Sequence, residues 1–377
     1  MPRWFGIAIG VGVLSLIWTS VVFTLVLPRA LSGPARLSIW INRSTRRVFF
    51  AISRLARAYE RKDAVLAPIG PVAVLAQLVV WLALIGAAFV VMLVPYTHDL
   101  GDAVNQVGAA MFTLGLARSA LYTNDTILIF AAASGFVVIA LQIAYLPALY
   151  AAFSRRESLI AMLASRAGEP SWGPEILIRH QLVGIVDVLP DFYNQWEQWA
   201  AEFSESHSTY PVLLLFRSPD PWSSWVLGLL SVLDAAAMQL ALNPTSAPSQ
   251  ARLSLRMGYT ALRRISDALG WTYDPDPLPD GPLQLTAEEF AAAVALLHDV
   301  GFATERNADE AWPHFRGWRV NYENLAYRWA DRVLAPPAPW SGTRTGLREQ
   351  NITPRRPPHR SPDQPANYRR PEFGSSS

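Results

Sequence analysis

Long uncharged apolar stretches alternate with charged segments in the first half of the chain. Three stretches, residues 4–28, 64–97 and 126–154, contain no Asp, Glu, Lys or Arg. Each exceeds the roughly 20 residues that a helix needs to cross the hydrocarbon of a bilayer. Because a spanning segment must satisfy its own backbone hydrogen bonds, these stretches are predicted to be helices. The pattern therefore predicts an integral membrane protein with three transmembrane helices.

A second pattern begins at residue 156, where charged, tryptophan-rich segments of helical spacing alternate with proline-containing turns. Thr286 followed by Glu289 is a capping box, and Gly301 stands where a helix would end in a left-handed residue. This pattern predicts a soluble, mostly helical cytoplasmic domain over residues 156–335. The expected helices run near residues 175–206, 222–242, 249–270, 286–300 and 308–334.

Three segments in the second half of the chain need separate interpretation. Residues 211–216 fit either a short strand or an apolar helical turn. Residues 222–242 are almost long and apolar enough for a fourth span, but Asp234 lies at their centre. Because a carboxylate at the middle of a bilayer costs several kcal/mol, a buried helix of the soluble domain is expected instead. Residues 336–377 are rich in proline, arginine and serine, which predicts a disordered tail.

Basic residues are concentrated in the linker between the first two stretches, residues 29–65, which contains eight arginines and one lysine against one glutamate and one aspartate. Basic loops stay in the cytoplasm, so the N-terminus is expected outside and the C-terminal domain inside. A cleaved signal peptide is the alternative for residues 4–28, but the basic linker would then be exported. The preference for arginine over lysine, with abundant alanine and proline, indicates a bacterial plasma-membrane protein.

The linker also places apolar residues among its arginines at roughly helical spacing. Such an amphipathic helix is expected to lie on the inner leaflet and to contact membrane lipids. The alternative is a helix that packs on the cytoplasmic domain.

Composition argues against an enzyme. The chain has no cysteine, and its six histidines are not paired at a helical ligand spacing, so no metal site is expected. Phosphate-binding, nucleophile-elbow and zinc-protease motifs are absent, and no cofactor or nucleic-acid partner is expected. Residues 274–280 contain three aspartates interleaved with prolines, which favours a rigid turn over a calcium loop. His207 is interpreted as a histidine satisfied within the domain.

The segment between the second and third stretches is not an ordinary polar loop. Residues 103–116 are largely apolar and uncharged, but too short to span a bilayer. A short apolar helix followed by Thr-x-Gly between two membrane helices is the layout of a pore loop, in which a half-helix enters the membrane and the chain returns extended. The alternative is an extracellular hairpin helix that packs two spans together, with Thr113 and Gly115 only ending the helix.

Residues 70–155 resemble the two-helix pore unit of the tetrameric potassium-channel superfamily. The resemblance rests on an outer helix, a pore helix, the run Thr-Leu-Gly-Leu-Ala and an inner helix with Gly135 roughly midway. It implies a homotetramer that passes a monovalent cation such as potassium, with Gly135 as the hinge of the inner helix. The implied selectivity-filter residues are Thr113, Leu114, Gly115, Leu116 and Ala117.

The inner helix carries three further candidate residues. Gln142 and Tyr145 are polar exceptions in an otherwise apolar inner cavity. Pro147 lies near the expected inner end of the helix, where a kink would place a gate.

The filter run departs from the family signature Thr-Val-Gly-Tyr-Gly-Asp. Leu116 replaces the aromatic residue, Ala117 the second glycine, and Arg118 the aspartate at the pore mouth. Without the second glycine the outer filter loses a residue of free backbone conformation, and a ring of arginines repels cations. These departures therefore leave two alternatives: a shorter, less selective filter, or a filter that tolerates anions.

The sequence thus predicts a mainly α protein whose function is that of a pore-loop ion channel, assembled or gated through its C-terminal domain. A non-conducting membrane-anchored receptor or scaffold that retains a channel-like membrane domain is the alternative. The predicted segments are 1–28 for the first transmembrane helix, 29–65 for the basic linker, 66–155 for the pore unit, 156–335 for the cytoplasmic domain and 336–377 for the tail.

Overall fold

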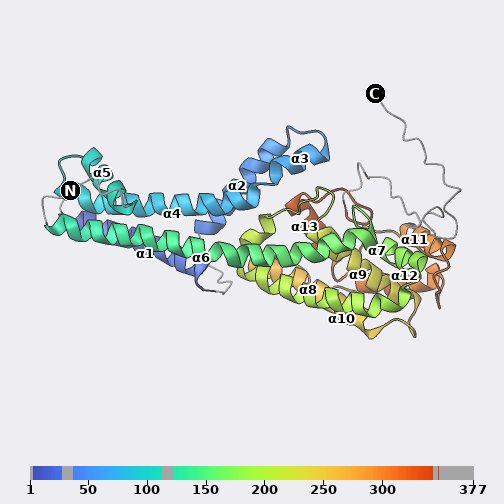
Figure 1. Cartoon of the computed structure of the whole chain (residues 1–377). Coiled ribbons are helices and arrows are strands. Elements are labelled where there is room, and N and C mark those ends of the chain that lie inside the picture. The colour runs from blue at the N-terminus through green and yellow to red at the C-terminus, as the bar shows by residue number, and fades with distance from the viewer. Residues whose placement is uncertain (1–2, 28–36, 113–121, 343–346, 348–377) are drawn as a thin grey trace, which may run out of the picture.

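The computed structural model describes residues 3–27, 37–112, 122–342 and 347, which are mainly helical and include no strand. Three long helices lie side by side at one end of an elongated molecule, and a group of shorter helices forms the other end (Figure 1). The N-terminus and α5 lie at the end far from the shorter helices, which is called the distal end below. The elements of this half are α1 (Arg3–Leu25), α2 (Leu37–Ser53), α3 (Tyr59–Leu66), α4 (Ile69–Leu93), α5 (Leu100–Met111) and α6 (Tyr122–Ala167).

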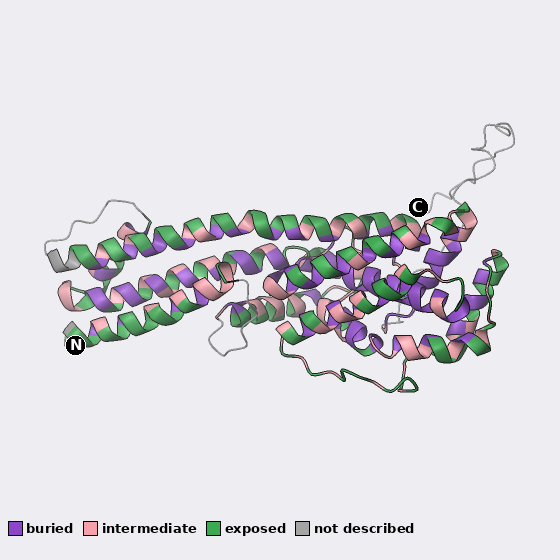
Figure 2. Cartoon of the chain, turned by 90° about the horizontal axis from the view of Figure 1, so that it is seen from below, coloured by how far each residue is buried: buried purple, intermediate pink, exposed green. Residues whose placement is uncertain are grey.

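In the described part of the chain, four helices are long and apolar enough to cross a membrane: α1, α4, α6 and α9 (Trp225–Leu242). They differ in how far the chain itself covers them. In an 18-residue apolar segment of each span, only 28%, 33% and 28% of the residues are buried for α1, α4 and α6, against 94% for α9. Exposed residues run along the three long helices, while buried residues concentrate in the shorter ones (Figure 2). Because exposed apolar surface is unfavourable in water, α1, α4 and α6 need an apolar surrounding that α9 already has.

Helix α1 packs against α4 through two glycines four residues apart, Gly6 and Gly10. A Cβ atom at Gly6 would lie 2.9 Å from the carbonyl oxygen of Val91, and one at Gly10 would lie 2.9 Å from that of Ala88. The Gly10 position would also overlap the side chain of Met92. The two glycines therefore set the close approach of the helices, as small residues do between membrane helices.

Replacing Gly10 with valine is expected to force α1 away from α4 and to lower the stability of the helix bundle by about 1–3 kcal/mol, the usual cost of overpacking. Gly12→Val is the matched control, because nothing lies within 4 Å of a Cβ atom at that position. Thermal unfolding of the detergent-solubilised protein, followed by tryptophan fluorescence, compares the variants. Equal losses in both would contradict the packing role of Gly10.

The basic linker folds into two helices instead of one continuous amphipathic stretch. Helix α2 ends at Ser53 and α3 begins at Tyr59. The Tyr59 hydroxyl donates a hydrogen bond to the carbonyl oxygen of Leu334, at 3.0 Å. This hydrogen bond attaches the beginning of α3 to the C-terminal half of the chain. The tertiary contact thus accompanies the break between α2 and α3.

Helix α6 joins the two halves of the molecule without interruption. Its 46 residues extend about 70 Å at the usual rise of a helix. Ile160 and Leu163, near its C-terminal end, belong to the core of the shorter helices. The boundary expected between residues 155 and 156 therefore falls inside one helix. Pro147 is accommodated within α6 and does not end it.

The C-terminal half is a helical domain built around α9. Six helices pack against α9, namely α6, α7, α8, α10, α12 and α13. This position explains why so apolar a helix carries a carboxylate at its centre, since Asp234 finds its partners inside the domain. The surrounding elements are α7 (Gly173–Val183), α8 (Leu189–Thr209), α10 (Ser249–Ala268), α11 (Ala287–Asp299), α12 (Ala308–Arg319) and α13 (Glu323–Val333).

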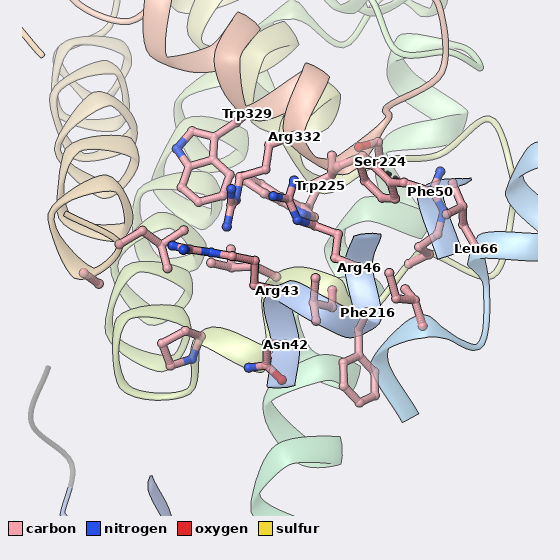
Figure 3. A pocket seen from close by; sticks show the side chains of 18 of the residues that line it. Asn42, Arg43, Arg46, Phe50, Leu66, Phe216, Ser224, Trp225, Trp329 and Arg332 are labelled. Carbon is pink, nitrogen blue, oxygen red and sulfur yellow. Dashed lines mark hydrogen bonds between the residues drawn. The ribbon is translucent and has the colours of Figure 1, made fainter. Parts of the chain in front are cut away.

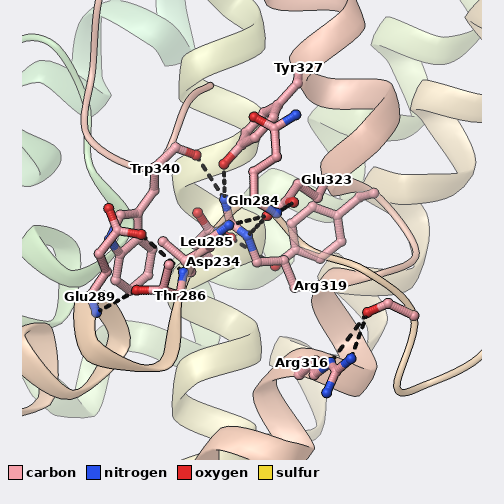
Figure 4. Close-up of polar contacts among 12 residues, drawn as sticks. Asp234, Gln284, Leu285, Thr286, Glu289, Arg316, Arg319, Glu323, Tyr327 and Trp340 are labelled. Carbon is pink, nitrogen blue, oxygen red and sulfur yellow. Dashed lines mark hydrogen bonds and ion pairs between the residues drawn. The ribbon is translucent and has the colours of Figure 1, made fainter. Parts of the chain in front are cut away.

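Asp234 belongs to a buried polar network between α9 and the last two helices (Figure 4). Its carboxylate forms an ion pair with Arg319 and accepts a hydrogen bond from the Tyr322 hydroxyl at 2.8 Å. The Arg319 side chain also bonds Glu323 at 2.7 Å and the carbonyl oxygen of Trp340 at 2.8 Å. Each buried charge thus has an opposite charge beside it, as burial in a low-dielectric core requires.

Several predicted elements of the domain need correction. The helix expected over residues 175–206 is broken at Gly184, whose positive φ of 71° ends α7. The helix expected over residues 308–334 is likewise two, because the chain turns after Arg319. Residues 211–216 form the 3-10 helix η3 (Pro211–Leu215), which agrees with the helical-turn alternative. The capping box at Thr286 is confirmed.

The predicted disordered tail begins too early. Residues 336–342 lie within the described part of the chain, and Trp340 is only 4% exposed. Its ring packs edge-on against Trp172, with ring centroids 5.7 Å apart. Composition could not reveal this, because a single buried aromatic residue is enough to fix the segment in a proline-rich context.

Candidate functional site

Helix α5 is a short helix that packs against both α4 and α6. Its N-terminus is capped by Asp99, whose carboxylate accepts a hydrogen bond from the backbone N–H of Asp102 at 2.7 Å. Its buried face, Ala103, Val107 and Met111, belongs to the same apolar cluster as residues of α1, α4 and α6. The helix thus begins beyond the distal end of α4 and turns its apolar face to the three long helices.

The C-terminal end of α5 lies well inside the layer of long helices. A Cβ atom at Gly135 would lie 2.9 Å from the carbonyl oxygen of Met111, and one at Gly86 would lie 3.4 Å from the Met111 sulfur. Gly135 stands thirteen residues after Tyr122, the first residue of α6, which corresponds to about 20 Å along the helix. Since bilayer hydrocarbon is about 30 Å thick, a depth of about 20 Å would lie inside such a layer and past its middle.

The predicted filter lies outside the described residues. This applies to Thr113, Leu114, Gly115, Leu116 and Ala117, and to Arg118 at the expected mouth. Their roles stay predictions. The described chain supplies the frame on either side, which is α5 up to Met111 and α6 from Tyr122.

The four candidate residues of the inner helix occupy different surroundings. At Gly135, α6 lies close to the backbone at the end of α5. Gln142 is buried within the chain, and neither its Oε1 nor its Nε2 has a partner among the described residues. Tyr145 packs edge-on against Tyr210, with ring centroids 5.5 Å apart. Pro147 is exposed. Gln142 and Tyr145 therefore face the interior of a single chain, and the cavity and gate roles assigned to these residues stay predictions.

Arg156 fastens α6 to the helical domain. Its guanidinium donates hydrogen bonds to the carbonyl oxygens of Leu213 at 3.0 Å and Phe216 at 2.8 Å. It also forms an ion pair with Glu157 at 2.7 Å, and Trp199 donates a hydrogen bond to its backbone carbonyl. In the sequence this arginine indicates only which side of the membrane the third stretch ends on. Its position directly after that stretch is the one sequence feature that points to a role at the junction.

A second fastening joins α3 to the domain through Arg217. This arginine pairs with the buried carboxylate of Asp63 at 2.5 Å and donates to the Tyr59 hydroxyl at 2.8 Å. It also donates to the carbonyl oxygen of Leu334 at 3.1 Å. The linker is thereby held at the domain, and sequence spacing gave no sign of this pairing because its partners lie 154 residues apart.

An apolar cluster at the same junction joins the first turns of α4 to η3 and to α6. Phe216 lies against Gly70, where a Cβ atom would approach its ring to 2.5 Å. Val74 and Leu149 belong to the cluster as well. With two polar fastenings and this cluster, the domain contacts the beginning of α4 and the middle of α6 directly.

His207 is buried beside Arg156 and is kept neutral by its surroundings. Burial lowers its pKa well below 6.5, and the positive charge of Arg156 lowers the pKa further. The distance from Arg156 Nη1 to His207 Nε2 is 3.2 Å, and Nδ1 lies 3.0 Å from the carbonyl oxygen of Phe203. Neutral His207 can accept from the arginine and donate to the carbonyl. A second proton on the ring would be repelled by the positive charge of Arg156. Both ring nitrogens of neutral His207 therefore have partners inside the domain, as predicted.

Acidification is expected to destabilise this junction through His207. The unfolded chain takes up a proton near pH 6.5, whereas folded His207 does so only at much lower pH. Stability is thus fully present above pH 6.5 and falls below it by up to about 1.4 kcal/mol per pH unit. His207→Gln removes that part of the slope, while the slope due to His180, whose pKa is also lowered by burial, persists. Urea unfolding at pH 7.5 and 5.5 measures this, with exposed His314→Gln as control. An unchanged slope in His207→Gln would contradict the assignment.

Among the described residues, no three His, Asp or Glu side chains gather in a group that could hold a metal ion. In the predicted turn after Tyr273, Asp274 accepts a hydrogen bond from the backbone N–H of Asp276 at 3.0 Å. This contact is typical of an Asx turn.

Comparison with known proteins adds no relative. No family model, no curated protein and no solved structure matches the chain. The function is therefore argued from the geometry of the chain itself.

Proposed function

We propose that this protein is a pore-loop membrane channel in which α1, α4 and α6 cross the membrane and α5 is the re-entrant half-helix. The observation that carries the proposal is the close approach of the Met111 carbonyl to Gly135, about a third of the way along the apolar stretch 126–154 of α6. A helix that ends at such depth leaves backbone carbonyls without helical partners. These groups persist inside a bilayer only where they face protein or a wet cavity.

The direction of α5 favours a cation as the permeant ion. A helix carries partial negative charge at its C-terminus, and here that end lies deepest. One half-helix per chain cannot enclose a pathway, so the channel is proposed to be a homotetramer that passes a monovalent cation such as potassium. The basic linker supports an orientation with α2 and the helical domain in the cytoplasm and the N-terminus outside.

The helical domain is proposed to assemble the channel or to gate it. Support comes from α6, which runs from beside α5 into the core of the domain, and from the fastenings through Arg156 and Arg217. A rearrangement of the domain would move the inner helix against the end of α5.

Reconstitution in a planar bilayer tests the proposal. Cation current is expected from the wild-type protein and from Gly12→Val, whose added side chain meets nothing within 4 Å. Gly115→Val is expected to abolish the current without preventing tetramer formation, and Arg118→Asp to increase it. The absence of current from the wild-type protein under any ionic gradient would overturn the proposal.

A non-conducting receptor or scaffold is the second candidate. The arginine at position 118, where the resembled family has an aspartate, favours it. Bilayers that carry no current, together with a stable tetramer on cross-linking, would favour this second function, because the pore architecture would then be retained without conduction.

A further inference from the structure

A cavity of about 340 Å³ lies where the linker helix α2 meets the helical domain (Figure 3). Its volume falls in the range of small-molecule binding sites. Among its described lining residues are four arginines, Arg43, Arg46, Arg217 and Arg332, and one carboxylate, Asp267. The cavity is therefore strongly positive, although the chain as a whole carries a formal net charge of only +2.

Three of the four arginines have no carboxylate partner among the residues that the structure describes. Arg217 is neutralised by Asp63, but Arg43, Arg46 and Arg332 take part in none of the ion pairs formed among the described residues. In Figure 3 their side chains converge on the same space from two sides, α2 and α13. Three unpaired guanidinium groups that share one cavity repel each other unless an anion lies between them.

Aromatic rings lie beside all three of these guanidinium groups. The Cζ atom of Arg43 lies 5.4 Å from the ring centroid of Trp40. The Cζ atom of Arg46 lies 5.3 Å from the ring centroid of Phe50, and that of Arg332 lies 5.4 Å from the ring centroid of Trp271. Stacking on a ring fixes the guanidinium plane and leaves its N–H edge available. That edge matches the oxygen geometry of phosphate.

The electrostatic cost of the arrangement is visible at Arg332. Burial and, after it, the positive charges of Arg46 and Arg43 together lower the pKa of this residue to about 10. The pKa of Arg46 is also lowered, first by burial and then by its arginine neighbours. Both shifts mean that the folded chain disfavours these charges in the absence of a counter-ion.

Two neutral polar groups in the lining also lack partners. Ser218 is 8% exposed, and its hydroxyl oxygen is buried without a hydrogen-bond partner among the described residues. The side-chain oxygen of Asn42 is buried and unpartnered in the same way. Since buried polar groups are normally hydrogen-bonded, a ligand that accepts and donates at this cavity would satisfy them. This observation is independent of the arginines.

Much of the remaining wall of the cavity is apolar. It includes Leu66 at the end of α3, Ile69 at the beginning of α4, and Leu214 and Phe216 of the domain. An anion with an attached apolar group fits such a lining better than a small inorganic ion does.

We propose that this cavity binds a phosphate-bearing ligand, with Arg43, Arg46 and Arg332 contacting the phosphate and Ser218 and Asn42 its remaining polar groups. The ligand is either the headgroup of an anionic lipid or a soluble phosphate ester. Bound there, it cross-links α2 to α13 and so strengthens the attachment of the linker to the domain. The proposal does not depend on ion conduction.

The test uses the full-length protein in lipid nanodiscs in phosphate-free buffer, with thermal unfolding followed by tryptophan fluorescence. One arm titrates inorganic pyrophosphate into discs of phosphatidylcholine, and the other compares these discs with discs containing phosphatidylglycerol. The variants are Arg46→Gln and Arg332→Gln. The matched control is Arg47→Gln, which removes the same charge from the same helix at an exposed position outside the cavity.

A rise in melting temperature with pyrophosphate, with half-saturation about tenfold weaker in Arg46→Gln and Arg332→Gln but unchanged in Arg47→Gln, supports the proposal with a soluble ligand. A rise with phosphatidylglycerol that shows the same dependence on the variants supports it with a lipid. No rise in either arm, or an equal loss in Arg47→Gln, overturns it. Without ligand, Arg332→Gln should melt no lower than the wild type, since it relieves repulsion. A lower melting temperature would make Arg332 a structural residue and overturn the proposal as well.

Discussion

Replacing Arg319 with methionine is expected to lower the free energy of unfolding of the helical domain by about 3–5 kcal/mol. Arg319 is fully buried and faces two carboxylates, those of Asp234 and Glu323. Methionine fills similar space but leaves both carboxylates in the core without their cation. Urea unfolding of the detergent-solubilised protein, monitored by the fluorescence of core residues such as Trp329, measures the loss.

Arg264→Met is the matched control, because Arg264 is exposed on α10 and its loss leaves no buried charge. A double replacement, Asp234→Asn with Arg319→Met, should recover part of the stability by removing one uncompensated charge. An Arg319→Met protein as stable as the control would show that the buried network contributes no net stability.

Gly135→Val is expected to displace the end of α5 and to abolish the proposed current. The carbonyl oxygen of Met111 lies 2.9 Å from where the new Cβ atom would stand, so backbone would have to move. Because the chain has no cysteine, Met111→Cys introduces a unique label. A membrane-impermeant maleimide should leave this cysteine unmodified in the wild-type background and label it in the Gly135→Val background.

Gly12→Val again serves as the control, since it adds the same side chain to α1 at a position where nothing lies within 4 Å of the new Cβ atom. It should retain current and leave the cysteine protected. Unchanged labelling and unchanged current in Gly135→Val would place the ion pathway away from the contact between α5 and α6.

Much of the helical architecture was predictable from sequence because its signals are local. The uncharged stretches gave α1, α4 and α6 as candidate spans, and the short apolar run gave α5 with an end near the predicted one. The capping box at Thr286 gave the start of α11 to the residue. Asp234 in an apolar helix pointed to burial, because the cost of a charge depends on its immediate surroundings.

The features that sequence did not reveal are long-range. The partners of Asp234 lie on α12 and in the residues after it, and Arg217 finds Asp63 across 154 residues. The breaks inside two expected helices also depend on tertiary contacts or on a single left-handed glycine, Gly184. The cavity between α2 and α13 could not be predicted for the same reason, although the arginines of α2 stand out in the sequence as part of the basic linker.

The length of α6 has a mechanical consequence. Helices resist bending more than loops do, and the described part of this one includes no break between the domain core and the distal end of the molecule. Over about 70 Å, a tilt of about 5° at one end displaces the other by about 6 Å. Small rearrangements among the helices of the domain would therefore become larger displacements at the distal end, and a distance measured between spectroscopic labels at Tyr122 and on α4 would register them.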